Sequence, residues 1–316
     1  MNSFSKFVAL CILIFIFLDQ LALLVFGHSY QLSHKYGWIN KAQTSYQTVQ
    51  DSPGVFRKVK AFYPKEGFKR YPEKEPNKPR ILIVGDSFTD MPWVSNGEEW
   101  YSYIEREFPA YQIYVSGNGG YGNLQEFMLI NDHLEEIDPK IVILQTCAND
   151  FNNNNFEAEL ALYPFNNPAW RPFWESDKVV YRLPLPFSFL RQNSFCIDRY
   201  LSLFDQIYKK ISSKEKVYSS YKIKKKDISI TSNIIQKIAQ RVSGRRLIIV
   251  EMCGALNALS QICSELNLDC ILDFKNKLLE QTTSEKIKVV NNGHFNLLGN
   301  HLAGEIMLKH LHERGL

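Results

Sequence analysis

The sequence predicts an α/β domain in which helices cover both faces of a parallel sheet, preceded by one apolar N-terminal helix. From about residue 79 onward, short apolar segments typical of buried strands alternate with longer segments of helical periodicity. This alternation is typical of parallel strands joined by right-handed helical crossovers. Residues 7–27 are almost entirely apolar, and about 20 residues suffice to cross a bilayer as a helix.

Five short apolar segments are expected to form the parallel strands of a three-layer α/β/α domain. They are residues 81–84 (ILIV), 112–117 (QIYVSG), 141–145 (IVILQ), 246–252 (RLIIVEM) and 286–290 (KIKVV). Helical spacing of apolar side chains predicts helices over residues 98–108, 123–137 and 297–311.

Residues 1–27 are predicted to be an uncleaved, single-pass membrane anchor. A cleaved signal peptide would end in a pattern of small residues, whereas VFGHSY ends this apolar run. Asp19 lies inside the span, where a carboxyl group is costly. It either pairs with a membrane-protein partner or is tolerated through local water. Lysines on the two sides of the span nearly balance, so charge does not set the orientation.

Two further regions complete the expected organisation. Residues 28–78 are polar and charged with scattered aromatic residues, and the segment YPKEGFKRYPEKEPNKPR (63–80) lacks periodicity, which predicts a stalk or linker that leads into a domain over 79–316. Within that domain, residues 151–243 interrupt the alternation with an Asn run and a Pro-rich aromatic stretch. Because this insertion follows the end of a strand, it is either a cap over the site or an extra packing layer.

Composition excludes several functional classes. A hydrophobic content of 45% over 316 residues supports a substantial core. A net charge of +4 with one short basic run (222–226) argues against nucleic acid as a partner. The six cysteines show no C-x-x-C spacing, so no metal site is expected. Cys263 and Cys270 either form a disulfide in an oxidising compartment or remain buried free thiols.

The candidate nucleophile is Ser87, which directly follows the first predicted strand. A turn at the carboxyl end of a parallel strand lies at the edge where α/β proteins place their sites. A hydroxyl group there needs a base, and His294 near the C-terminus is the candidate. A nucleophile early in the chain and a histidine late in the chain indicate a serine hydrolase. In isolation, Ser87 would more often be a helix N-cap.

Four short blocks in a fixed order give the sequence a resemblance to a known family. They are Gly85-Asp86-Ser87-Phe88, a glycine within 116–123 (SGNGGYGN), Cys147-Ala148-Asn149-Asp150 and Asn291-Asn292-Gly293-His294. In this respect the chain resembles the SGNH (GDSL-type) hydrolases across residues 79–150 and 285–311. The resemblance implies a flavodoxin-like fold and esterase or acyl-transfer chemistry without a cofactor.

The resemblance also assigns roles to single residues. Ser87 would attack an acyl carbonyl, and His294 would accept its proton. The oxyanion would bind to the backbone N–H groups of Ser87 and Gly120 and to the side chain of Asn149. Asn291 stands where the family has the aspartate of its catalytic triad, and an amide cannot stabilise an imidazolium by charge.

Three arrangements remain open for the third member of the triad. A backbone carbonyl orients His294, another carboxylate such as Asp273 substitutes, or the protein is catalytically weak. A rival glycine pattern, Gly117-x-Gly119-x-x-Gly122, matches a dinucleotide-binding motif. It follows the second strand and lacks the ribose-binding acid about 20 residues further on, so no cofactor is expected.

The expected function is hydrolysis of an acyl ester, with an O-acetylated envelope glycan as the preferred substrate class. This expectation, and a periplasmic location for the anchored domain, come from the resemblance. Two alternatives have the same sequence features: an O-acyltransferase, and an inactive protein that binds or assembles glycans.

Overall fold

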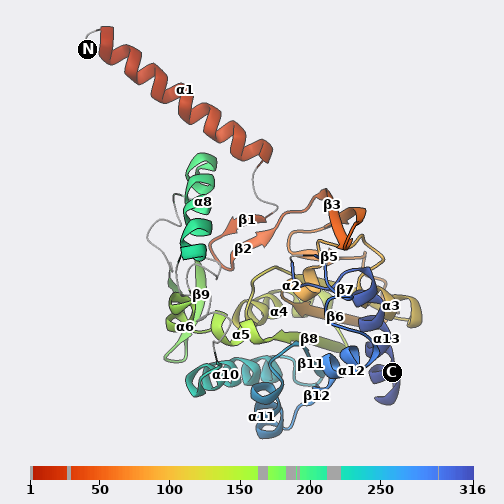
Figure 1. Cartoon of the computed structure of the whole chain (residues 1–316). Helices are drawn as coiled ribbons and strands as arrows, with labels where there is room; N and C mark the ends of the chain where they lie inside the picture. Colours follow the sequence, from red (N-terminus) through yellow and green to blue (C-terminus); the bar gives the residue numbers. More distant parts are fainter. Residues whose placement is uncertain are drawn as a thin grey trace.

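A six-stranded sheet forms the centre of the domain in the computed structural model (Figure 1). The structure describes residues 3–26, 30–162, 170–182, 190, 193–211, 222–290 and 292–316. The strand order is β12-β11-β8-β6-β7-β5. The strands are β5 (Phe68–Arg70), β6 (Arg80–Gly85), β7 (Gln112–Gly117), β8 (Ile141–Cys147), β11 (Arg246–Cys253) and β12 (Asp269–Ile271). All neighbours pair in parallel except β5, which runs antiparallel to β7 at one edge.

Helices cover both faces of this sheet, as the sequence predicts. Alternate residues of β6 face opposite ways: Leu82 and Val84 lie in one core cluster, Ile81 and Ile83 in the other. The first face is covered by α4 (Asn123–Ile137), α10 (Lys225–Arg241) and α11 (Leu256–Leu266). The second face is covered by α3 (Trp100–Glu107), α12 (Phe274–Gln281) and α13 (Leu297–Glu313). The three-layer α/β/α prediction is therefore confirmed.

The central position of β6 determines where a site can form. β6 pairs with β7 on one side and with β8 on the other, so the chain leaves it in opposite directions. Such a switch point opens a crevice at the carboxyl ends of the strands, where ligands bind in open α/β sheets. Ser87 lies two residues after the end of β6, at this edge of the sheet.

The fifth parallel strand is not where the sequence places it. Residues 286–290 form turns with one isolated bridge, between Lys288 and Phe295, and the fifth parallel strand is β12. The Val289 amide donates to the His294 carbonyl at 2.9 Å, so this segment folds back on itself. Its apolar residues pack in this turn, whereas β12 (DCI) is too short to show a strand pattern.

Most of the segment predicted to be a linker is folded. It forms two antiparallel hairpins, β1 (Tyr30–Ser33) with β2 (Gly37–Asn40) and β3 (Thr44–Ser52) with β4 (Val55–Phe62). Its next strand, β5, joins the central sheet. The prediction of a stalk is therefore wrong for residues 30–70. Its aromatic side chains explain the difference, because Trp38, Tyr63 and Phe68 are buried against the domain.

The predicted insertion divides into two parts. Near the end of β8 it contains α5 (Ala148–Asn153), α6 (Phe156–Ala161) and the hairpin of β9 (Arg171–Glu175) and β10 (Lys178–Arg182). Its last helix, α10, instead belongs to the layer that covers the sheet, with Ile234, Ile235 and Ile238 fully buried. The part of the chain that interrupts the alternation of strands and helices thus ends before α10.

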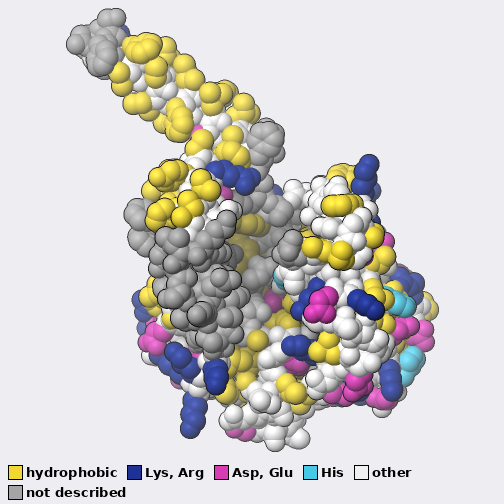
Figure 2. All heavy atoms as spheres, viewed as in Figure 1, with side chains coloured by type: hydrophobic (Ala, Val, Ile, Leu, Met, Phe, Trp, Pro, Cys, Tyr) yellow, Lys and Arg dark blue, Asp and Glu magenta, His cyan; other side chains and the backbone are white. Residues whose placement is uncertain are grey.

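The N-terminal helix α1 (Ser3–Phe26) projects away from the domain with a largely hydrophobic surface (Figure 2). Its Ser5–Leu23 segment is long and apolar enough to cross a membrane, which suits an anchor or a signal sequence. Asp19 is only 5% exposed, and its carboxylate accepts a hydrogen bond from the Cys196 amide at 2.8 Å. Cys196 lies in the first turn of α8 (Phe195–Ile211), so this carboxylate has a partner within the chain.

Candidate active site

The turn after β6 presents Ser87 at the edge of the sheet. Asp86 is the N-cap of α2 (Ser87–Asp90), and its carboxylate accepts a hydrogen bond from the Phe88 amide at 2.9 Å. Ser87 is therefore not the cap, and its hydroxyl is left for other contacts. Glycine is required at position 85, because a Cβ there would lie 2.4 Å from Gln145 Oε1.

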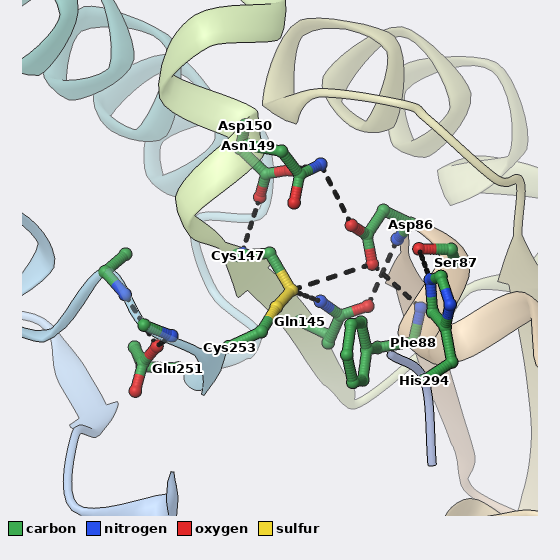
Figure 3. Close-up of a disulfide and its surroundings, with 12 residues drawn as sticks. Asp86, Ser87, Phe88, Gln145, Cys147, Asn149, Asp150, Glu251, Cys253 and His294 are labelled. Atoms are coloured by element: carbon green, nitrogen blue, oxygen red, sulfur yellow. Dashed lines mark hydrogen bonds between the residues drawn. A yellow bond between two sulfur atoms is a disulfide. The ribbon is translucent and has the colours of Figure 1, made fainter. Parts of the chain in front are cut away.

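The structure brings Ser87 and His294 together from opposite ends of the domain sequence. Ser87 Oγ lies 2.8 Å from His294 Nε2, and the two side chains point toward each other (Figure 3). The Trp93 ring stacks on the imidazole, with centroids 4.1 Å apart, and Phe88 lies at 4.9 Å. This is the geometry of a nucleophile and its general base.

The surroundings keep His294 neutral. Burial lowers the pKa of His294 to about 4; a hydrogen bond from the imidazole Nδ1–H to the Asn292 carbonyl opposes this shift, and the Lys288 charge acts in the same direction as burial. At neutral pH the imidazole is therefore ready to accept a proton at Nε2.

Asn292, rather than a carboxylate, orients the imidazole. His294 Nδ1 lies 3.2 Å from the Asn292 carbonyl oxygen and also contacts Oδ1 of the same residue. Both are acceptors, so Nδ1 carries the proton and Nε2 is free to accept one from Ser87. Of the three open arrangements, this is the backbone carbonyl. Asp273 is engaged elsewhere, with Lys277 at 2.7 Å and His310 at 3.3 Å. Asn291 lies outside the described residues.

Asn149 extends from the start of α5 toward the same turn. Its Nδ2 donates to Asp86 Oδ2 at 3.1 Å (Figure 3). It also donates to Asn153 Oδ1 at 3.1 Å. The Asp150 carboxylate accepts from the Cys147 amide at 2.9 Å and fixes the start of the helix. Burial raises the pKa values of Asp86 and Asp150.

The glycine loop after β7 lies on the other side of Ser87. A Cβ built at Gly119 would lie 4.0 Å from Ser87 Cβ. The Gly119 carbonyl accepts a hydrogen bond from Trp38 Nε1 at 3.0 Å. In a trans peptide the carbonyl and the next N–H point in opposite directions. Trp38 therefore determines where the N–H of Gly120, the predicted oxyanion donor, is directed.

Two further side chains hold this loop. Arg171 Nη2 donates to the Gly120 carbonyl at 3.0 Å, and Asn40 Nδ2 donates to the Gly117 carbonyl at 3.0 Å. Arg171 is fully buried and paired with Glu159 at 3.0 Å. The sequence analysis missed all of these residues, because they lie in the expected linker and insertion. The only sequence signal was the density of aromatic and amide side chains there.

The rival glycine pattern has a packing explanation. A Cβ at Gly117 would lie 2.2 Å from the Asp90 amide nitrogen, and one at Gly122 would lie 2.8 Å from Asn154 Oδ1. Gly117 is thus required by the close approach of the α2 backbone, and Gly122 by the side chains of Asn153 and Asn154. Among the described residues, no group of three or more His, Cys, Asp or Glu side chains is arranged to hold a metal ion.

A disulfide closes the other side of Asn149. Cys147 at the end of β8 is bonded to Cys253 at the end of β11, with Cα atoms 4.9 Å apart (Figure 3). This disulfide cross-links the ends of two adjacent strands of the sheet. Cys263 and Cys270 form a second disulfide, which is one of the two alternatives left open by the sequence.

Comparisons with known proteins give the following likenesses. No protein-family model and no curated protein matches the chain. Among solved structures, it is similar to a lipolytic protein of the G-D-S-L family from Veillonella parvula (14% identity, 73% of this chain and 97% of that chain, TM-score 0.43). It is also similar to a psychrotrophic esterase from Pseudoalteromonas (13% identity, 75% of this chain and 98% of that chain, TM-score 0.44). A third similar structure is that of a two-domain esterase active on acetylated mannans (11% identity, 75% of this chain and 49% of that chain, TM-score 0.44). The solved structural neighbours of this chain are thus esterases of the G-D-S-L type and related enzymes.

Proposed function

We propose that this protein is a serine esterase in which Ser87 is the nucleophile and His294 is the general base. The observation that carries the proposal is the 2.8 Å contact between Ser87 Oγ and Nε2 of a neutral imidazole. The contact lies at the switch point of a parallel sheet, where a substrate can reach it.

The reaction would proceed in two halves. Ser87 Oγ attacks the ester carbonyl while its proton moves to His294 Nε2, and the carbonyl oxygen becomes an oxyanion. The N–H groups of Ser87 and Gly120 would donate to that oxyanion, and so would the Asn149 amide after it releases Asp86 or Asn153. The tetrahedral species then expels the alcohol, which takes the proton from His294. Water, activated by the same imidazole, hydrolyses the acyl-enzyme.

The missing carboxylate lowers the expected rate without abolishing it. In a well-studied protease, replacing the triad aspartate by asparagine costs about 10⁴-fold, partly because the histidine adopts the wrong tautomer. Here Nδ1 faces two acceptor oxygens of Asn292, so the tautomer is the productive one. The remaining cost is the lost charge stabilisation of the imidazolium, so the expected loss of rate is smaller than in that protease.

The cysteines and the N-terminal helix support a proposal for the compartment. The Cys263–Cys270 disulfide favours an oxidising compartment. The proposal therefore places the domain on the extracytoplasmic side of the membrane, anchored through α1. The resemblance to SGNH hydrolases supports an O-acylated envelope glycan as the substrate class. Transfer of the acyl group to a second hydroxyl would use the same residues.

The test is hydrolysis of p-nitrophenyl acetate by the full-length protein in a non-ionic detergent. Ser87→Ala should lower kcat/KM about a thousandfold or more. Ser264→Ala, at an exposed serine on α11, is the matched control and should leave the rate unchanged. Equal rates for Ser87→Ala and the unaltered protein would refute the proposal.

A further inference from the structure

A pocket of about 400 Å³ lies beside the Ser87–His294 pair. It reaches the site through Phe88 and Gly293, the chain neighbours of the two reacting residues, and through Asn149. Most of its wall is apolar, including Leu162, Met252, Leu278, Ile287 and Phe295. This volume falls in the range of small-molecule sites and exceeds what an acetyl group needs.

The charges in this pocket are all of one sign. Lys275 and Lys288 line it, and none of the described lining residues carries a carboxylate. Lys288 is half-buried and Lys275 is exposed at the rim. Within the described part of the chain, neither lysine forms an ion pair. A mostly apolar pocket with two cations and no described anion is suited to a ligand that carries a negative charge.

Lys288 has a second consequence for the reaction. Its positive charge acts on His294, which must become an imidazolium during acyl transfer. SGNH hydrolases place a carboxylate beside this histidine, whereas here Asn292 contributes only neutral oxygens. Lys288 thus disfavours the imidazolium that the reaction must form. An anionic group bound at Lys288 would remove this opposition.

We propose that this pocket selects esters that carry a carboxylate or phosphate group, held by Lys288 and Lys275. The inference rests on the proposed function, because it names the substrate class of the same site. The negative charge lies on either the acyl or the alcohol side of the ester, and these two arrangements can be separated experimentally.

Turnover of matched substrates by the full-length protein in a non-ionic detergent tests the inference. On the acyl side, mono-p-nitrophenyl glutarate is compared with its neutral methyl ester. On the alcohol side, 4-acetoxybenzoate is compared with 4-acetoxybenzamide. We expect kcat/KM to favour the anionic member of at least one pair by about tenfold. Lys288→Gln should remove most of this preference, and rising ionic strength should weaken it.

Two further variants separate charge from side-chain shape. Lys288→Arg keeps the cation and should retain the preference. Lys286→Gln neutralises an exposed lysine two residues away that does not line the pocket, and it should change nothing. A wild-type enzyme without preference in both pairs, or a preference that survives Lys288→Gln, would overturn the inference.

A binding measurement distinguishes failure of this inference from failure of the proposed function. The Ser87→Ala variant is titrated calorimetrically with 4-acetamidobenzoate and 4-acetamidobenzamide, and with glutarate and its monoamide. Tighter binding of the anion, lost in Ser87→Ala/Lys288→Gln, would support the pocket assignment even if no ester were hydrolysed. Ester hydrolysis combined with equal binding of anionic and neutral probes would support the proposed function and refute the anion selectivity.

Discussion

The two sides of Ser87 are built differently. On the oxyanion side, the glycine loop and Asn149 are held by buried polar side chains: Trp38 and Arg171 fix two consecutive carbonyls, and Asp86 holds the amide. On the other side, the described residues hold the His294 ring through Asn292 and through contact with the Trp93 and Phe88 rings.

This contrast indicates where the catalytic power would reside. Preorganised donors act strongly in a buried site because they need no reorganisation when charge develops. On the histidine side, none of the described hydrogen-bond partners of the imidazole is a carboxylate that would stabilise an imidazolium. The oxyanion side should therefore contribute more to the rate than the group that orients the base. If the oxyanion side contributes more to the rate than the group that orients His294, the changes below should have decreasing effects in the order given.

Removal of the Asn149 amide should have the largest effect. Asn149→Ala removes one oxyanion donor, and kcat should fall about a hundredfold or more with little change in KM. Steady-state kinetics with p-nitrophenyl acetate provide the measurement. A fall of less than threefold would remove Asn149 from the oxyanion hole.

Trp38→Phe should have an intermediate effect. Phenylalanine retains most of the ring packing but loses the N–H that holds the Gly119 carbonyl. Without this bond the Gly120 N–H is no longer directed, so kcat should fall about tenfold while KM stays nearly constant. Trp170→Phe, at a partly exposed tryptophan stacked on Tyr181, is the control. Equal loss of kcat in both variants would argue against a positioning role for Trp38.

Asn292→Asp should increase the rate by a smaller factor. A carboxylate at this position would stabilise the imidazolium and raise the pKa of His294. We expect kcat to rise about threefold to tenfold, with the acidic limit of activity moving to higher pH. An unchanged acidic limit would show that position 292 does not act on His294.

The smallest expected effect is the loss of activity of the unaltered enzyme in mild acid. His294 must be neutral to accept a proton, and its pKa is lowered to about 4. Since the lowered pKa keeps the imidazole neutral in mild acid, kcat/KM should stay nearly flat from pH 7.5 to pH 5 and fall near pH 4. A fall centred near 6.5, the ordinary value for histidine, would mean that burial does not control this group.

Much of the fold could be predicted from the sequence. Strands buried on both faces, such as β6 and β8, have continuous apolar runs, and a helix such as α4 has clear periodicity. β12 could not be found, because three residues show no pattern. The hairpins of residues 30–62 were missed because they are stabilised by contacts with the rest of the domain rather than by a strong local pattern.

The candidate site likewise contains residues that the sequence predicts and residues that it does not. Ser87 and His294 stand in recognisable motifs, and the structure places them in contact. Trp38 and Arg171 act through single long-range hydrogen bonds to backbone carbonyls, and no local motif marks such a bond. The Cys147–Cys253 pairing depends on β8 and β11 being neighbours, which only the folded sheet reveals.

Covalent labelling by a fluorophosphonate tests the central claim most directly, because only an activated serine reacts at a useful rate. The full-length protein should gain one phosphonate group, located on Ser87 by peptide mass spectrometry, and His294→Ala should greatly slow the reaction. A protein that remains unlabelled, or is labelled at another serine equally well in both forms, would contradict the account.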